Sequence, residues 1–416
     1  MSRIPRFRER DRAGRIRAVS DAAGGLDVRA LDGGISFPQA DRMIENALGV
    51  MAIPLGVATN FVVNGQDVLV PMAIEEPSVV AAASKAALAC RQTGGFAVSC
   101  SDPVSIGQIQ VLGAGPGADR RIGEAALRIL EAANACSRTL PNQGRGAKSV
   151  SSRTIRAPSG PMLIVEILVD VGDAMGANIT NTMCEAVSPI IEEAAGGRAL
   201  LRILSNYSTG RVASASAVFP ADMLGKDTVR DMILAYEFAD NDVYRAVTHN
   251  KGVMNGIMAV ANATGQDSRA IDAAAHAWAA RSGRYRSLTT WSKNEAGDLV
   301  GSMEVPMSVG IVGGVVRVHP TARACLDMLG VSSAGELAGV MAAAGLAQNF
   351  GAMRALATVG IQRGHMRLHA RNVAAAAGVP PDMIERIAGE MAKEGNISAE
   401  RARTLAGAGN GVDSSR

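Results

Sequence analysis

The sequence predicts an α+β multidomain protein in which a small α/β domain is inserted into a larger domain of helices and sheet. The chain has 416 residues, more than one typical hydrophobic core holds, so we expect two or three domains. Between residues 102 and 204, apolar strand-like runs flank helical periodicity and a basic Gly-rich stretch, a mixture typical of an α/β insertion. After residue 360, helical pieces are separated by Gly378-Val379-Pro380-Pro381 and by Gly395, which predicts a small, hinged helical unit at the C-terminus.

The composition is that of a globular protein. Hydrophobic residues make up 48% of the chain and charged residues 19%, which excludes a disordered class. Lysine and arginine exceed aspartate and glutamate by only three (42 against 39), so the net charge gives no reason to expect a polyanionic partner. The arginine-rich stretch Arg3–Arg17 is interpreted as a solvated or interface-forming segment, with nucleic-acid binding as the remote alternative.

Cysteine usage and hydropathy predict a soluble cytoplasmic protein. Five cysteines are scattered without a C-x-x-C pair, so we expect neither a disulfide framework nor a zinc site. The basic N-terminus is not followed by the apolar run of a secretory signal. The most hydrophobic stretch, Leu299–Val318, is interrupted by Glu304, Pro306 and several glycines, so no membrane helix is expected there.

Local patterns place helices, strands and loops along the chain. Turn and capping residues predict strands around an Asn64-Gly65 hairpin before residue 70, and a helix over Val79–Arg91 that Gly94-Gly95 ends. Further expected elements are strands over Val104–Leu112 and Met162–Val171, helices over Glu124–Asn134, Met175–Ala195, Asp267–Ala280 and Ala334–Leu356, a flexible basic loop over Asn142–Arg156, and a disordered tail over Ala406–Arg416.

Three polar motifs are candidates for chemistry, and each has a structural alternative. Glu75-Glu76-Pro77-Ser78 is a ligand site or simply a charged helix start. The stretch Thr248–Gly256 places polar groups between Gly252 and Gly256, which allow close approach to a ligand, although a polar surface loop would look similar. The junction Asp170–Asn178 joins a strand to a helix whose N-terminus attracts phosphate, or is an ordinary cap.

Familiar cofactor and metal motifs are missing from the sequence. No G-x-G-x-x-G follows a strand, and Gly113–Gly117 is better explained as a surface turn. The stretch Arg145–Ser149 lacks the Gly-Lys pair of a Walker loop. His365 and His369 share one helix face, but a metal would need a further ligand, so no metal site is predicted.

Together the motifs resemble the hydroxymethylglutaryl-CoA reductases over most of the chain, from about residue 35 to 378. The main motifs are Glu75-Glu76-Pro77-Ser78, Asp173-Ala174-Met175-Gly176-Ala177-Asn178, His249–Gly256 and Gly364-His365-Met366. Further segments that match are Glu45-Asn46 with Gly49, Pro54-Leu55-Gly56-Val57-Ala58, Gly345-Leu346-Ala347-Gln348-Asn349 and Gly360-Ile361-Gln362-Arg363. The missing membrane anchor and the extended C-terminal region look like the soluble, bacterial class II form.

The resemblance implies a reaction and four catalytic residues. The family interconverts hydroxymethylglutaryl-CoA and mevalonate plus CoA, with two hydride transfers to or from NAD(P), in the mevalonate metabolism that feeds isoprenoids. Lys251 is then the cation that stabilises the developing oxyanion. Asp267 hydrogen-bonds this lysine, Glu76 protonates the aldehyde-level carbonyl, and His365 protonates the departing CoA thiolate.

The resemblance also implies binding residues. Arg245 and Asn255 hold the carboxylate and hydroxyl of the acyl group, with Ser78 and His369 as weaker candidates. The nucleotide junction is matched by Asp173, Met175, Gly176 and Asn178. The region Gly144–Arg153 carries no acid that would repel a 2′-phosphate, so Lys148, with Arg145 or Arg153, is expected to accept the phosphate of NADP, and NADPH to be at least tolerated.

Three domains and a homodimer follow from the resemblance. The large catalytic domain comprises residues 1–101 and 205–359, with its N-terminal part in dimerisation; residues 102–204 form the nicotinamide-nucleotide domain, and residues 360–416 the flap that carries His365. The active site is expected at the interface of a homodimer, without nucleic acid, membrane or metal. The alternatives are another nicotinamide-dependent acyl-CoA reductase with a Lys–Asp pair, or a CoA-binding or structural protein on the same scaffold.

Overall fold

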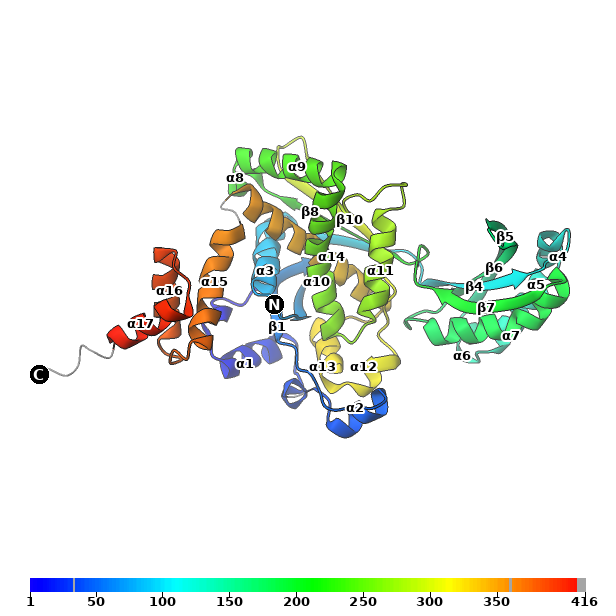
Figure 1. Ribbon diagram of the computed structural model, residues 1–416, viewed down its shortest axis with the longest axis horizontal. Coiled ribbons are helices and arrows are strands. Elements are labelled where there is room, and N and C mark those ends of the chain that lie inside the picture. Colours follow the sequence, from blue (N-terminus) through cyan, green and yellow to red (C-terminus); the bar gives the residue numbers. More distant parts are fainter. Residues whose placement is uncertain (33, 359–360, 410–416) are drawn as a thin grey trace, which may run out of the picture.

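The computed structural model describes residues 1–32, 34–358 and 361–409, and the side chains of all of these except 361–368 and 408–409. The molecule is elongated, with a large central body, a smaller body of strands and helices at one end, and the C-terminal helices at the other (Figure 1). Helices and strands are mixed along the whole chain, which confirms the predicted α+β class. Residues near the beginning, middle and end of the chain therefore share the central body.

The central body is organised by a six-stranded sheet with the order β2-β1-β3-β8-β10-β9. Strands β1 and β2 form the predicted hairpin around Asn64-Gly65, while β1 and β3 pair in parallel. The bounds of these strands are Leu55–Val63 (β1), Gln66–Ala73 (β2), Phe96–Cys100 (β3), Val212–Phe219 (β8), Thr289–Lys293 (β9) and Leu299–Pro306 (β10).

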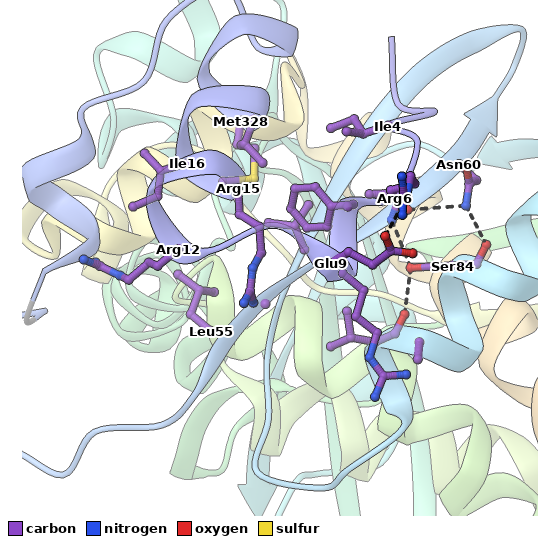
Figure 2. A pocket seen from close by; sticks show the side chains of 18 of the residues that line it. Ile4, Arg6, Glu9, Arg12, Arg15, Ile16, Leu55, Asn60, Ser84 and Met328 are labelled. Carbon is purple, nitrogen blue, oxygen red and sulfur yellow. Dashed lines mark hydrogen bonds and ion pairs between the residues drawn. The ribbon is translucent and has the colours of Figure 1, made fainter. Parts of the chain in front are cut away.

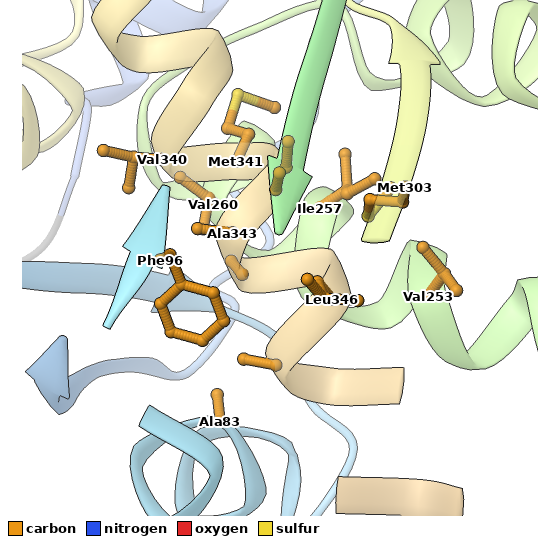
Figure 3. Packing of buried hydrophobic residues seen from close by; sticks show 14 of the residues in the cluster. Ala83, Phe96, Val253, Ile257, Val260, Met303, Val340, Met341, Ala343 and Leu346 are labelled. Atoms are coloured by element: carbon orange, nitrogen blue, oxygen red, sulfur yellow. The ribbon is translucent and has the colours of Figure 1, made fainter. Parts of the chain in front are cut away.

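Helix α14 (Ala334–Ala357) is buried on nearly all sides and lies between this sheet and helix α10 (Val243–Ala263). Figure 3 shows Ala343 and Leu346 of α14 packed among Ile257 and Val260 of α10 and Phe96 of β3. The many alanines and glycines of α14 allow this close packing: a Cβ added to Gly339 would lie 2.7 Å from a methyl group of Val98, and one added to Gly345 2.8 Å from Ile257. Small residues on α14 thus let the helix, the sheet and α10 pack closely in the core.

The remaining helices of the central body surround this core. Helix α3 begins at Val79, immediately after Glu75–Ser78, as the capping pattern predicts. The bounds are Val79–Cys90 (α3), Ala221–Leu224 (α8), Lys226–Asn241 (α9), Ser268–Ala279 (α11), Gly314–Val318 (α12) and Pro320–Leu329 (α13), preceded in the chain by α1 (Arg12–Ala22), α2 (Phe37–Met43) and short 3-10 turns at Phe7–Glu9, Val28–Leu31 and Arg91–Thr93.

A second hydrophobic core belongs to a segment that is inserted in the chain between β3 and β8, two strands that are neighbours in the central sheet. The chain leaves β3 at Cys100 and returns at Val212 on β8, which pairs antiparallel with β3. In between, a four-stranded sheet with the order β5-β6-β4-β7 packs on helices. Its elements are β4 (Val104–Leu112), α4 (Ala118–Glu124), α5 (Ala126–Ala135), α6 (Thr139–Asn142), β5 (Gly146–Ala157), β6 (Gly160–Asp170), α7 (Ala177–Ala195) and β7 (Arg198–Ser205).

The C-terminal helices have a small core of their own. Helices α15 (Ile361–Ala376), α16 (Ile384–Glu394) and α17 (Ala399–Gly409) bury Ala370, Ile387, Met391 and Ala402 against one another. Gly378 takes a positive φ of 82° at the turn after α15, and Gly395 takes 69° after α16, as helix-ending glycines do. The expected disordered tail is wrong for residues 406–409, which continue α17, while residues 410–416 lie outside the described part.

The expected basic loop over Asn142–Arg156 is also wrong. Most of it is strand β5, which pairs with β6 from Gly146 to Ala157. The strand lies at the edge of its sheet and is mostly exposed, so it needs few apolar residues and resembles a loop in the sequence. In the described residues, no single helix is both long and apolar enough to cross a membrane, although the bent pair α13 and α14 would reach the required length and composition together.

Candidate functional site

A cavity of about 280 Å³ lies where the N-terminus of α3, the middle of α10 and the end of α14 meet. Polar groups from all three elements face it, although these elements are far apart in the chain. The residues that line it are Glu76, Pro77, Ser78, Val79, Ala82, Arg245, Thr248, His249, Lys251, Gly252, Asn255, Gln348, Asn349, Gly351, Ala352, Ala355 and Leu356. The fold therefore brings together Glu76, Ser78, Arg245, Lys251 and Asn255 of the predicted set.

Glu76 and Lys251 form the polar centre of this cavity. The Lys251 ammonium donates to Oε2 of Glu76 at 2.6 Å, and Nδ2 of Asn255 donates to the same oxygen at 3.2 Å. Lys251 and Asn255 are four residues apart on α10 and therefore lie on one face of the helix. One carboxylate thus holds a lysine and an amide beside the cavity, an arrangement that can stabilise negative charge on a bound oxygen and exchange a proton with it.

The stretch Thr248–Gly256 is helical, so its interpretation as a loop is wrong. It forms the middle of α10, where Asn250 is fully buried and bonds to the backbone of Arg286 and Leu288. A side chain at Gly256 would overlap the backbone carbonyl of Ala344, so this glycine serves the packing of α10 on α14. By contrast, Gly252 lines the cavity with open space around it, so it keeps the cavity wide.

Ser78 has a backbone conformation that is unusual for a residue with a side chain. Its φ is 76°, in the left-handed region, and it precedes α3 without capping that helix through its hydroxyl. Such strain is kept in folded proteins mainly at functional sites. The Pro77-Ser78 turn aims Glu76 at α10 and leaves the Ser78 hydroxyl beside the cavity.

Arg245 lies six residues before Lys251 on α10 and lines the same cavity. Burial lowers the pKa of its guanidinium below the ordinary value. No carboxylate within the described residues forms a salt bridge with Arg245, unlike most of the other partly buried arginines. A half-buried arginine that faces a cavity in this way is suited to bind a carboxylate from a ligand.

His249 is buried beside Arg245, and sequence reasoning assigned it no role. Nε2 of His249 lies 2.7 Å from Oγ1 of Thr289 and 3.1 Å from Nδ2 of Asn349. Burial, and to a lesser degree the charge of Arg245, lowers the pKa of His249 to about 3. The imidazole is therefore neutral at any physiological pH. Its partners are 40 and 100 residues away in the chain, so no local signal predicts them.

The expected hydrogen bond between Lys251 and Asp267 is not formed within the chain. Asp267 caps α11 by accepting from the amide of Ala270, and it pairs with Arg269 at 3.2 Å. Gln266 donates its amide to the carbonyl of Ala261, ten residues after Lys251 on α10. At the helical rise this places Asp267 about 15 Å from Lys251 along the axis, beyond the reach of the two side chains.

The predicted nucleotide junction lies at the Asp267 end of α10. The side chain of Gln266 bonds to both backbone groups of Gly310, and the neighbouring Ile311 amide donates to the carbonyl of Asp173. Oδ1 of Asp173 accepts from the amide of Ala334 at the start of α14. Through these bonds the inserted unit is attached to the central body beside Asp267.

Two features make the start of α7 suitable for a phosphate group. Gly176 precedes the helix with φ of 96°, so no side chain satisfies the first-turn amides. A Cβ at Gly176 would lie 2.7 Å from Val171 and 2.9 Å from Ser105, so only glycine fits. Asn178 is exposed in the first turn. The long helix therefore presents unsatisfied amides and the positive end of its dipole.

Arg211 holds this junction in place and was missed by sequence reasoning. Its buried guanidinium donates to the carbonyls of Ala174, Met175 and Val309, and burial lowers its pKa to about 10. Those partners are 36 to 98 residues away in the chain, so the sequence around Arg211 gives no sign of the role.

Lys148 lies at an irregularity of β5, where the register shifts between Ala147 and Ser149. The neighbouring Gly146 pairs with Asp170, so this part of β5 is beside the nucleotide junction. Arg153 pairs with Glu166 at 3.1 Å and Arg145 lies 3.8 Å from Asp170, whereas Lys148 is exposed and bonds to the carbonyl of Gly144. Of the three predicted cations, Lys148 is the one whose charge is not matched by an acid within the described residues.

The two predicted histidines of the C-terminal unit lie on α15. The side chain of His365 is outside the described residues, so its position toward the cavity is not described. His369 is exposed one turn later on the same helix. Across the described ranges, no group of three histidine, cysteine or acidic side chains is arranged to hold a metal ion.

A second, larger cavity of about 670 Å³ lies on another face of α3, under the N-terminal segment (Figure 2). Its wall is apolar where Ile16, Leu55 and Met328 face it, and Arg12 and Arg15 stand at its edge. The residues that line it are Ile4, Arg6, Phe7, Arg8, Glu9, Arg12, Arg15, Ile16, Val19, Leu31, Leu55, Gly56, Val57, Thr59, Asn60, Val80, Ala81, Ser84, Lys85, Leu88 and Met328.

Comparison with known proteins identifies the family of this chain. The model of the hydroxymethylglutaryl-coenzyme A reductase family matches residues 12–370. The chain belongs to the hydroxymethylglutaryl-coenzyme A reductase family. Its sequence is 50% identical to 3-hydroxy-3-methylglutaryl-coenzyme A reductase of Archaeoglobus fulgidus, over 97% of this chain and 94% of that protein.

Solved structures agree with the assignment. A reductase of Streptococcus pneumoniae superposes with a TM-score of 0.82 at 36% identity, covering 96% of this chain and 98% of the other. A class II reductase from the same organism, bound to NADPH in open conformations, superposes with a TM-score of 0.81 at 37% identity, covering 96% and 100%. The predicted class II resemblance is confirmed, and the chain is an oxidoreductase that interconverts hydroxymethylglutaryl-CoA with mevalonate and CoA.

Proposed function

We propose that Glu76, Lys251, Asp267 and His365 carry the reaction, with the acyl group bound in the cavity between α3, α10 and α14. The observation that carries the proposal is the 2.6 Å contact of Lys251 with Glu76 at the wall of a cavity that Arg245 also faces. A cation beside a carboxylic acid matches the two demands of carbonyl reduction, which are to stabilise charge on oxygen and to supply a proton.

In this scheme Lys251 donates a hydrogen bond to the thioester oxygen as negative charge develops on it. Asn255 and Lys251 hold the Glu76 carboxyl beside the same oxygen, so Glu76 delivers the proton when the aldehyde-level carbonyl is reduced. His365, on α15, protonates the departing CoA thiolate, because an imidazole titrates near neutral pH. Asp267 keeps Lys251 charged and oriented.

The free carboxylate of the acyl group binds Arg245. The guanidinium matches a carboxylate with two parallel hydrogen bonds, and its burial strengthens them. Ser78 lines the same cavity from the start of α3, and His369 of α15 is the other, weaker candidate for contact with the acyl group. Asn255, one turn beyond Lys251, is placed to meet the hydroxyl of the acyl group.

The CoA moiety occupies the second cavity, under the N-terminal segment. Both cavities share α3: Val79 and Ala82 line the first, while Ser84 and Lys85 line the second. Arg8, Arg15 and Lys85 form no salt bridge within the described residues, so their charges are available to the CoA phosphates, and the apolar wall suits the pantetheine arm.

The nicotinamide cofactor binds at the Asp173–Asn178 junction. The amides at the start of α7 and the close approach that Gly176 allows fit a pyrophosphate, while Asp173, Met175 and Asn178 form the surrounding surface. When bound, the dinucleotide supplies the hydride. Lys148 accepts the 2′-phosphate in this proposal, so NADPH, which is bound in the class II enzyme of S. pneumoniae, is tolerated as a cofactor.

The domains then have separate tasks. Residues 1–101 and 205–359 form the catalytic domain, residues 102–204 the nucleotide domain, and residues 360–416 the flap that brings His365 to the thiolate. We place the protein in the cytoplasm, because all five cysteines are free thiols, and burial raises the pKa of Cys90, Cys184 and Cys325 to about 12.

The active site is completed by a second copy of the chain in a homodimer. Lys251 and Asp267 lie about 15 Å apart along α10 in one chain, so the Asp267 that meets Lys251 comes from the partner. Apolar side chains in two surface regions are available to bury: Ile44, Leu48 and Met51 in one, Phe238 and Tyr244 in the other, with Leu48 99% and Tyr244 84% exposed.

One assay tests the proposal. Purified protein is given hydroxymethylglutaryl-CoA with NADPH or NADH, and nucleotide oxidation and CoA release are followed separately. We expect two hydride equivalents per CoA, with little turnover of acyl-CoA substrates that lack the free carboxylate. Turnover that is indifferent to that carboxylate would contradict the role of Arg245.

A further inference from the structure

The hydrogen-bond network around His249 fixes which of its ring nitrogens carries the proton. Nε1 of Trp291 is a donor only, and it donates to Oδ1 of Asn349 at 2.9 Å. This donor orients the Asn349 amide so that its Nδ2 donates to Nε2 of His249 at 3.1 Å. Oγ1 of Thr289 lies 2.7 Å from the same Nε2 and 3.1 Å from Oδ1 of Asn349, and because Trp291 already donates to that oxygen, the single hydroxyl proton of Thr289 goes to Nε2. Nε2 is therefore an acceptor.

A neutral imidazole whose Nε2 accepts must carry its proton on Nδ1. Nδ1 of His249 is buried and has no hydrogen-bond partner within the described residues. The residue is only 2% exposed, and its ring lies at the wall of the cavity that holds Arg245 one turn earlier on α10. A buried donor without an acceptor costs about 1–3 kcal/mol, which a ligand oxygen would recover.

We propose that the Nδ1–H of His249 is a hydrogen-bond donor to an oxygen at the carboxylate end of the acyl group, beside the guanidinium of Arg245. The inference rests on the proposed placement of that group in the cavity. His249 is then a binding residue that never exchanges its proton, while Trp291, Thr289 and Asn349 are positioning residues that hold the tautomer.

The charges around the ring favour such a neutral donor. Arg245 faces it from its own helix and Asp240 from α9, and Lys251 is half a turn further along α10. A second protonation would place another cation beside Arg245 in a buried site. In this arrangement Arg245 is the permanent cation that binds the carboxylate. The neutral imidazole of His249 adds a directional hydrogen bond without a further charge.

Two substitutions of His249 distinguish the role of Nδ1 from the role of Nε2. In His249→Asn the amide nitrogen occupies the place of Nδ1 and the contact to Thr289 is lost. In His249→Gln the amide lies near the place of Nε2 and the cavity-side donor is lost. We expect His249→Gln to raise the KM for hydroxymethylglutaryl-CoA about 10-fold or more, since hydrogen bonds to charged groups are worth about 1.5–3 kcal/mol.

We expect His249→Asn to keep the KM within about three-fold of the wild type but to lower Tm more than His249→Gln does, because it breaks the network with Thr289 and Asn349. Equal KM values in the two variants, or KM changes that follow Tm, would overturn the inference. Arg245→Lys is the matched control. If it leaves KM unchanged, the placement of the acyl group itself is wrong; if it raises KM while the His249 variants are alike, only the role of His249 fails.

A measurement on the wild-type protein does not depend on the variants folding. With ¹⁵N-histidine labelling, NMR reports the tautomer of His249, assigned by its loss in either variant or by its insensitivity to pH. We expect a neutral ring with the proton on Nδ1, whose resonance shifts when 3-hydroxy-3-methylglutarate is added. A proton on Nε2, or no shift at saturating acid, would overturn the inference.

Discussion

The middle of helix α10 and the segment just beyond its C-terminus contact different parts of the molecule. Near its middle, Lys251 meets Glu76 beside a cavity that Arg245 faces, and we propose that this acyl half binds and polarises the acyl group. Beyond its C-terminus, in the nucleotide half, Gln266 bonds to Gly310, whose neighbour Ile311 donates to the carbonyl of Asp173, and Asp267 directly follows Gln266 in the chain. A helix is a rigid spacer, so Lys251 and Asp267 stay apart within one chain. We therefore propose that a complete catalytic site needs a second copy of the chain.

The largest expected effect comes from removing the cation of the acyl half. Lys251→Met should lower kcat by roughly 10³-fold, because preorganised charge at the oxyanion is usually the largest catalytic contribution. The KM for hydroxymethylglutaryl-CoA should change little, since Arg245 and the second cavity remain. Lys226→Met, on α9 and away from both cavities, is the control for a lost lysine charge. Near-normal turnover in Lys251→Met would break the assignment.

The nucleotide half should respond to a different substitution. Gly176→Val places a side chain where the φ of 96° and the contacts with Val171 and Ser105 leave no room. We expect the KM for NADPH to rise by about 30-fold or more while the KM for hydroxymethylglutaryl-CoA stays near normal. Steady-state kinetics with each substrate varied in turn measures this. A parallel rise in both KM values would show that the halves are not separate.

The acyl half should also make stability depend on pH. The pKa of His249 is about 3 in the folded protein against 6.5 when exposed, so between these values the unfolded chain binds a proton that the folded chain does not. The free energy of unfolding should fall as pH drops below 6.5, by at most about 1.4 kcal/mol per pH unit. Urea unfolding at pH 7 and pH 5 measures it. The dependence should be weaker in His249→Asn, and an equal dependence in both proteins would assign it to other groups.

The smallest expected effect concerns cofactor choice. Lys148→Ala should lower kcat/KM for NADPH by about 10-fold and leave NADH nearly unchanged, as loss of one charged hydrogen bond predicts. Arg156→Ala is the matched control, because Arg156 is exposed at the other end of the same strand. A strong preference of the wild type for NADH would remove the basis for this prediction.

Much of the fold is predictable because local signals agree with it. The Pro77-Ser78 start and Gly94-Gly95 end define α3, and the alternation of Val104–Leu112 defines β4. Strand β5 was missed because an edge strand with one neighbour carries mostly polar residues. The middle of α10 looked like a loop because its glycines serve helix packing and cavity width, which depend on α14 and on nothing nearby in the sequence.

The residues of the candidate site also fall into two groups, those that motifs in the sequence reveal and those that only distant contacts define. Glu76, Lys251 and Asn255 were found through motifs, and their meeting confirms that the motifs belong together in space. Arg211 and the network of His249 were not found, because each acts through backbone or side chains tens of residues away. The missing contact of Lys251 with Asp267 has another cause: motifs identify the residues but carry no information on whether one chain or two supply them, and we propose that two do.

Mixing two inactive variants shows whether Lys251 and Asp267 of different chains form one active site. Lys251→Met and Asp267→Asn are each expected to be inactive, and the two are unfolded together and refolded as an equal mixture. If the halves come from different chains, half of the mixed dimers' sites contain both native residues, so about a quarter of wild-type activity should return. If Lys251 and Asp267 act within one chain, every site lacks one of them. A mixture as inactive as its components would show that the active site is not shared between two chains.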